Sequence, residues 1–77
     1  MKLLQGIKGN TYTVTAIDLD DAAKRRFEIL GMTLGTAIEI INQKPSGSKI
    51  IRLRGTRFAI GRDFAEGITV EPTEVKH

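Results

Sequence analysis

Residues 25–40, RRFEILGMTLGTAIEI, constrain the fold more than any other part of the sequence. Reading back from Leu30, the apolar residues Phe27 and Ala23 follow at spacings of three and four, which define one face of a helix. Gly31 comes next, where a left-handed helix C-cap favours a residue without a Cβ. The stretch therefore predicts a helix that ends near Leu30, with Leu30 itself in the core.

After Gly35 the apolar period falls to two, because Ile38 and Ile40 alternate with Glu39. A short helix is therefore expected to lead through a tight turn straight into a strand. The stretch contains no catalytic group, which favours a binding role over an enzymatic one.

The helix is predicted from about residue 20 to residue 30, with Asp18 or Asp20 as its N-cap. Elsewhere, β-branched residues alternate with polar ones and are bounded by glycines, which is typical of short strands. Strands are expected at residues 12–17, 36–43, 49–54, 57–60 and 68–70, with a further short strand at 2–5, a hairpin turn at 45–48 and one helical turn at 62–66.

Five or so short strands and one helix predict a mainly β fold, a small antiparallel barrel of SH3-like type. An OB-type barrel is the main alternative, although its helix usually falls between the third and fourth strands. Residues 1–77 are expected to form a single domain, with residues 71–77 as a flexible polar tail.

The composition favours a cytoplasmic protein. The chain has no cysteine, which fits a reducing compartment, and no apolar run near the length of a membrane span. Residues 1–17 lack the continuous apolar stretch of a signal peptide.

The net charge of +3 is unevenly spread, since no acid falls between Glu39 and Asp63. That basic span suits an acidic protein, a phosphate or a nucleic acid, or is simply a solvated strand face. Its cations are Lys44, Lys49, Arg52, Arg54, Arg57 and Arg62.

Three ordered pieces of sequence resemble the FeoA family of bacterial ferrous iron transport. The first is RFEILGMTLG at residues 26–35, where family members typically show Arg-Leu-x-x-Leu-Gly-Met/Leu-x-x-Gly. Phe27 replaces the family's Leu with another apolar residue. The second piece is the hairpin with Pro45 and Gly47, and the third is AIGR at 59–62 followed by AEGITV at 65–70. The resemblance covers residues 12–70.

The resemblance implies an SH3-like barrel that contacts the cytoplasmic GTPase part of the large iron permease, FeoB, and modulates transport. A related domain also occurs at the C-terminus of metal-dependent repressors of the diphtheria toxin repressor type. A stand-alone relative of that domain is therefore an alternative. The family is also associated with transition metal ion binding, for which this sequence offers few ligands.

No metal, cofactor or catalytic site is expected. The only histidine is His77, and a transition-metal site requires three or four convergent ligands. Asp18, Asp20 and Asp21 are better placed to cap the helix than to gather a cation. No nucleophile–base pairing and no phosphate-binding glycine loop is present.

Partner-binding residues are expected in the turn after the helix and in the basic span. A flexible Met beside a Leu suits a protein-docking patch if the turn leaves them exposed. Guanidinium groups bind carboxylates and phosphates in bidentate fashion. The candidate partner-binding residues are Met32, Leu34, Arg52, Arg54 and Arg57.

A small basic barrel that binds nucleic acid is the alternative from a different functional class. Single-strand binders need exposed aromatic platforms, and three of the four aromatic residues here look like core. The four are Tyr12, Phe27, Phe58 and Phe64. Nucleic acid is therefore not the expected partner, and the chain is expected to be a monomer or a weak dimer.

Overall fold

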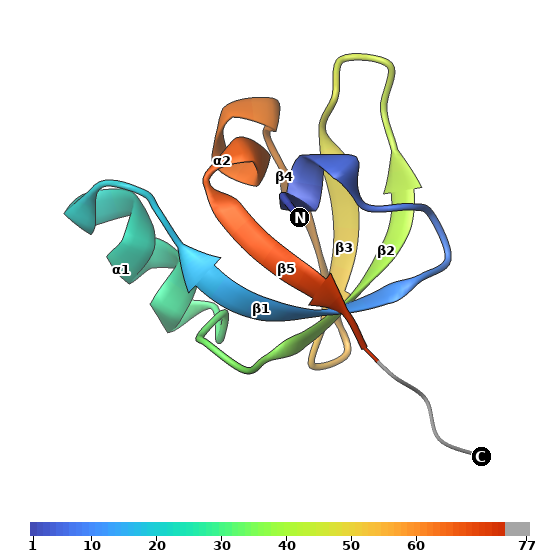
Figure 1. Cartoon of the computed structure of the whole chain (residues 1–77). Coiled ribbons are helices and arrows are strands. Elements are labelled where there is room, and N and C mark those ends of the chain that lie inside the picture. Colours follow the sequence, from blue (N-terminus) through green and yellow to red (C-terminus); the bar gives the residue numbers. More distant parts are fainter. Residues whose placement is uncertain (74–77) are drawn as a thin grey trace.

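The computed structural model describes residues 1–73 as five strands and three short helical segments (Figure 1). The helix from Asp21 to Ile29 falls between the strands at residues 11–17 and 37–43, where the sequence predicts it. The elements in chain order are η1 (Leu3–Gln5), β1 (Thr11–Ile17), α1 (Asp21–Ile29), β2 (Ala37–Gln43), β3 (Lys49–Leu53), β4 (Thr56–Ile60), α2 (Arg62–Glu66) and β5 (Ile68–Pro72).

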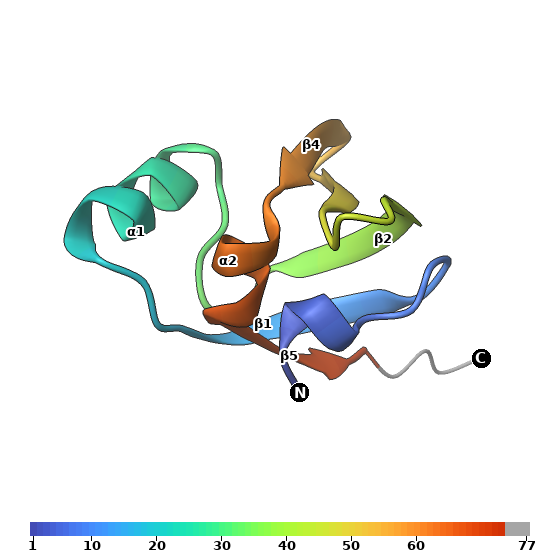
Figure 2. The same cartoon turned by 90° about the horizontal axis from the view of Figure 1, so that it is seen from above.

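The strands form one antiparallel sheet in the order β4-β3-β2-β1-β5. The sheet is strongly curved, so that β5 and β4 turn back over its concave face together with η1 and α2 (Figure 1 and Figure 2). The pairing is irregular between Val14 and Ala16 of β1 and between Ile40 and Asn42 of β2, and bulges of this kind bend a strand.

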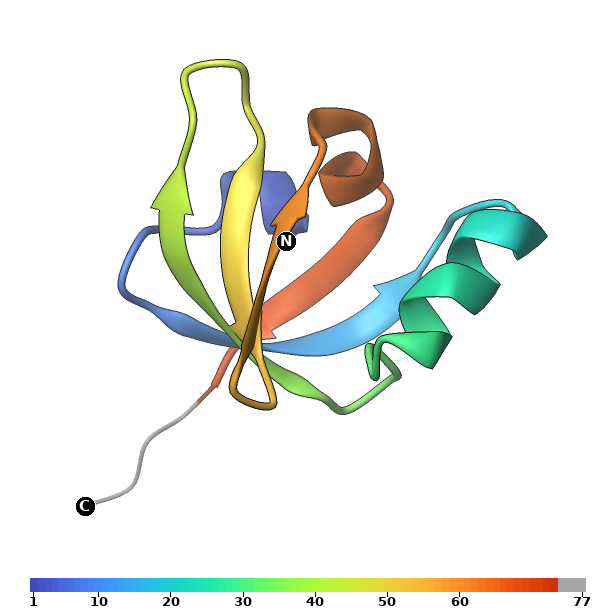
Figure 3. The ribbon, with the colours of Figure 1, turned by 180° about the vertical axis from the view of Figure 1, so that it is seen from behind.

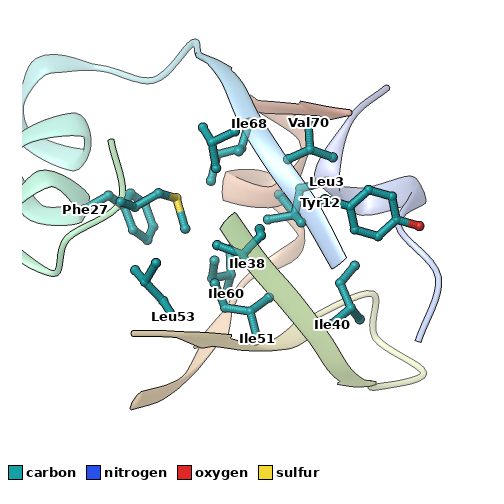
Figure 4. Close-up of a cluster of buried hydrophobic side chains, with 13 residues drawn as sticks. Leu3, Tyr12, Phe27, Ile38, Ile40, Ile51, Leu53, Ile60, Ile68 and Val70 are labelled. Carbon is teal, nitrogen blue, oxygen red and sulfur yellow. The ribbon is translucent and has the colours of Figure 1, made fainter. Parts of the chain in front are cut away.

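The core fills the concave side of the sheet (Figure 4). Alternate residues of each strand point inward, and in β3 these include Ile51 and Leu53, which are buried. The other buried apolar residues are Leu3, Tyr12, Val14, Phe27, Met32, Ile38, Ile40, Ile60, Ala65, Ile68 and Val70. Arg52, which lies between Ile51 and Leu53 in the sequence, is on the opposite, exposed face of β3.

The predicted strand at residues 2–5 is wrong, because Leu3–Gln5 form a turn of 3₁₀-helix. Only the chain start pairs with β5: the Met1 ammonium donates to Val70 O at 3.0 Å, and Val70 N–H donates to Met1 O at 2.7 Å. The chain must then turn to bury Leu3, which is 0% exposed. A straight strand would carry that side chain away from the core.

The final strand is longer than predicted, because Glu71 and Pro72 belong to β5 rather than to a tail. Thr13 of β1 pairs with Glu71, and Thr73 N–H donates to Thr11 O at 3.1 Å. The rest of the expected tail, residues 74–77, lies outside the described residues.

The C-cap of α1 explains why the burial of Leu30 and Met32 differs from the prediction. Gly31 adopts φ +101°, its N–H donates to Glu28 O at 3.0 Å, and Met32 N–H donates to Phe27 O at 2.9 Å. These are the two hydrogen bonds of a Schellman motif, in which the residue after the glycine packs against the helix. Met32 is accordingly buried, and Leu30 is 41% exposed instead of being core.

We expect Gly31→Ala to lower the free energy of unfolding by about 1–2 kcal/mol, because a Cβ disfavours the left-handed backbone. Urea unfolding measures this loss. Gly31→Asn is the matched control, since Asn tolerates this conformation better and should cost less. A fully stable Gly31→Ala variant would contradict the assigned cap.

Burial distinguishes the two apolar residues of the same turn. Met32 is 1% exposed and Leu34 is 66% exposed. Met32→Ala should therefore cost about 2–4 kcal/mol of unfolding free energy, whereas Leu34→Ala should change it by less than about 0.5 kcal/mol. Thermal or urea unfolding of the two variants checks the contrast, and equal losses would show that the turn is packed differently.

Candidate functional site: the groove between α1 and β1

Helix α1 lies to one side of the curved sheet (Figure 2 and Figure 3). Of its nine residues only Phe27 is buried. The Phe27 ring meets the ring of Phe64 from α2 edge to face, with centroids 5.6 Å apart. Asp20 caps the other end of the helix, accepting from Ala23 N–H at 2.8 Å, which confirms one of the two predicted caps. The helix is thus held at its ends and at one side chain.

A hollow of about 410 Å³ separates this helix from β1. We call it the α1–β1 groove. Strand β1 forms one wall, α1 the other, and the turn after the helix closes the end. The lining residues are Thr15, Ala16, Ile17, Lys24, Glu28, Thr33 and Leu34.

The groove exists because β1 loses one of its neighbours halfway along. β2 pairs with β1 only at residues 11–13, whereas β5 pairs with it as far as Ile17. At Val14 the partner is already the turn, since Gly35 N–H donates to Val14 O at 2.7 Å and Val14 N–H to Thr36 O at 2.9 Å. Beyond Val14, the side of β1 that faces α1 borders the groove instead of a strand.

Leu34 is presented by a well-fixed turn. Its neighbours Thr33 and Thr36 join their hydroxyls at 3.0 Å, and Thr33 N–H donates to Thr36 Oγ1 at 3.2 Å. The two bonds of Val14 attach the same turn to β1. Leu34 is 66% exposed, and because the turn beneath it is already ordered, a partner that covers this side chain does not have to order the backbone as well.

The structure does not bring Met32 to this surface. Its side chain is 1% exposed and belongs to the core cluster, so the predicted Met32–Leu34 patch reduces to Leu34. Ile29, the last residue of α1, is 80% exposed and was not singled out from the sequence. Its position next to the helix C-cap is the feature of the sequence from which its exposure could have been predicted.

The three candidate arginines have different surroundings. Arg52 on β3 pairs with Glu39 of β2, with Nη1 and Oε1 3.2 Å apart. Arg54 has φ +52° in the β3–β4 turn, and its side chain lies against Gly31, where an added Cβ would be 3.5 Å from its Cδ and Nε. Arg57 faces Arg52 across the β3–β4 pair. Arg54 therefore lies beside the helix end, while Arg52 and Arg57 lie on the outer sheet face.

A second hollow, of about 530 Å³, opens beside η1 and includes Lys49 in its wall. Lys49 is only 4% exposed, and its Nζ donates to Gln43 Oε1 at 2.6 Å and to Gly6 O at 3.1 Å. The ammonium thus holds the N-terminal segment to the β2–β3 hairpin through neutral oxygens, which is a structural role.

Within residues 1–73, no group of three His, Cys, Asp or Glu side chains is placed to hold a metal ion. His77 lies outside these residues. Over the same range, the helices are too short and too polar to cross a membrane.

Comparison with known proteins gives a consistent result. The model of the FeoA domain family matches residues 1–72. An Fe(2+) transport protein A of Methanocaldococcus jannaschii is 33% identical over 67 residues, which cover 87% of this chain and 80% of that protein. The FeoA protein of Chlorobium tepidum superposes with a TM-score of 0.89 at 28% identity, covering all of this chain and 74% of the other.

The fold is of the predicted SH3-like type. The FeoA protein of Stenotrophomonas maltophilia, solved with zinc and described as a prokaryotic SH3 domain protein, superposes with a TM-score of 0.78 at 26% identity, over 92% of this chain and 89% of that one. A manganese-dependent transcriptional repressor shares the fold alone, with a TM-score of 0.84 at 21% identity, and this chain spans 41% of its length. From its sequence and its fold, the chain belongs to the FeoA domain family of ferrous iron transport.

Proposed function

We propose that the chain is a non-enzymatic, cytoplasmic accessory module of ferrous iron uptake. It binds the cytoplasmic GTPase part of a FeoB-type permease and modulates transport. Membership of the FeoA family supports the transport setting. The α1–β1 groove with Leu34 at its end is the observation that supports a protein partner.

The groove has the chemistry of a small protein-docking site. Leu34 supplies an apolar anchor, and Lys24 and Glu28 supply a charged rim. Ile29 adds a second exposed apolar side chain at the end of the same helix. A partner that inserts one apolar side chain against Leu34 would cover the surface that the folded chain leaves open.

Helix α1 and its N-cap carry equal numbers of anions and cations, but the cations are consecutive in the middle of the helix, and this local run suits an acidic group on a partner. Lys24, Arg25 and Arg26 are exposed, and within residues 1–73 none of them forms an ion pair. Charges of this kind raise the association rate and orient the encounter more than they add affinity.

The iron ion is cargo of the permease in this proposal and is not held by the chain. The zinc in the Stenotrophomonas maltophilia protein belongs to that protein. In residues 1–73 of this chain, the grouped oxygen and nitrogen ligands that a transition metal needs are lacking.

The nucleic-acid alternative gains little from the fold. Tyr12 is buried, and its hydroxyl accepts from Ile7 N–H at 2.9 Å. Phe27 is buried, and Phe64, which is 39% exposed, already contacts it. These rings are engaged in packing rather than free to stack on bases.

We expect Leu34→Asp to weaken binding to the purified cytoplasmic domain of the permease by more than about tenfold, because a buried interface anchor becomes a charge. Isothermal titration calorimetry measures the affinity. Ile7→Asp is the matched control, since Ile7 is also exposed, at 61%, but lies away from the groove. It should bind like the unsubstituted chain.

The stability of both variants is checked by thermal unfolding before titration. If a folded Leu34→Asp variant binds as tightly as the unsubstituted chain, the groove is not the docking surface. If the unsubstituted chain itself fails to bind, the permease is not the partner.

A further inference from the structure

Strand β4 forms a free edge of the sheet, because the strand order ends there. Thr56, Arg57 and Ala59 are exposed. An exposed edge of this kind presents unpaired backbone groups to any extended chain that approaches it.

The turn before β4 determines which backbone groups point outward. Arg54 and Gly55 both have positive φ, +52° and +81°, as in a two-residue type I′ hairpin. The closing pair, Leu53 and Thr56, is then hydrogen-bonded, and alternate pairs along the ladder are not. Arg57 and Ala59 fall in the pairs without hydrogen bonds. Their N–H and C=O groups therefore point away from β3.

The side chains across the same sheet form an incomplete row of charges. Glu39 on β2 faces Arg52 on β3, and Arg52 faces Arg57 on β4. The first two form an ion pair at 3.2 Å, whereas within residues 1–73 Arg57 has no acidic partner. Like charges directly opposite one another destabilise a sheet, most of all in pairs without hydrogen bonds, where side chains lie closer.

We propose that the free edge of β4 binds an extended acidic segment of a partner protein by β-strand addition. The backbone of Arg57 and Ala59 hydrogen-bonds the added strand, and a carboxylate of that strand lies opposite Arg57. The two adjacent arginines of the row then have an acid on each side, Glu39 at one end and the carboxylate of the added strand at the other. This site goes beyond the groove of the proposed function and does not depend on it.

A second copy of the chain is a poorer occupant of this edge. An antiparallel pair of two β4 strands centred on Phe58 would place Arg57 opposite Ala59 of the other copy and bring the two arginines close. The sequence offers no acid to separate them, since none lies between Glu39 and Asp63. The same arginine therefore opposes self-pairing and favours an acidic strand.

The probes are two capped peptides, acetyl-TVEVT-amide and acetyl-TVKVT-amide, titrated at millimolar concentration into the ¹⁵N-labelled full chain. In the added strand, the valines lie on the face of half-buried Phe58, and the central residue lies opposite Arg57. We expect the amide signals of Arg57 and Ala59 to move most. The glutamate peptide should bind about tenfold more tightly than the lysine peptide.

Two variants test the charge and the backbone separately. Arg57→Glu should reverse the preference, so that the lysine peptide binds more tightly. Ala59→Pro should abolish binding of both peptides, because it removes an outward N–H while an edge strand tolerates proline. Lys8→Glu carries the same change of charge on an exposed loop and should keep the original preference.

Dispersed amide spectra confirm that each variant is folded before it is compared. Equal binding of the two peptides, no binding at millimolar concentration, or shifts confined to the α1–β1 groove would each overturn the proposal. An Arg57→Glu variant that still prefers the glutamate peptide would overturn it as well. Leu34→Asp should leave peptide binding unchanged, which separates this site from the groove.

Discussion

The hydrogen bond from Met32 N–H to Phe27 O, 2.9 Å long, determines how the helix meets the barrel. It reverses the chain through Gly31 and places Met32 beside Phe27 in the core. Phe27 is the only buried residue of α1, so the helix depends on this one anchor. The reversal also sends Leu34 outward, which makes the groove possible.

Both candidate surfaces arise where β pairing stops. The α1–β1 groove begins where β2 leaves β1, after Val14. Strand β4 is the last strand of the order. In the row of charges across the sheet, Arg52 is paired with Glu39, whereas within residues 1–73 Arg57 on β4 has no acidic partner. In a domain of 77 residues, most apolar side chains are needed for the core, so binding features are left to strand ends and turns.

Local patterns in the sequence predicted most of the fold. Period-two alternation located β2, β3 and β4, and Gly31 was correctly predicted as a left-handed cap. The errors came from tertiary packing. The helical spacing that places Phe27 in the core points equally to Leu30, but the cap exchanges Leu30 for Met32. Residues 2–5 were predicted as a strand, whereas Leu3–Gln5 form a turn that buries Leu3. That burial is a tertiary contact, which the local sequence pattern does not show.

The candidate site was predictable only in part. Leu34 could be named from its place between two glycines, and the structure leaves it exposed. The wall opposite, at Thr15, Ala16 and Ile17, depends on which strand stops pairing first, and short-range periodicity carries no such information. The basic span was visible as composition, whereas the pairing of Arg52 with Glu39 required the register of β2 against β3.

The central claim is that holding α1 away from β1 creates the surface that meets the transport partner. Mapping amide signals of the ¹⁵N-labelled chain on addition of the permease's cytoplasmic domain tests it most directly. The account predicts the largest changes at Ala16, Ile17 and Leu34, around the groove. A complex that forms while these amides stay unchanged, with perturbations confined to the hollow beside η1, would contradict it.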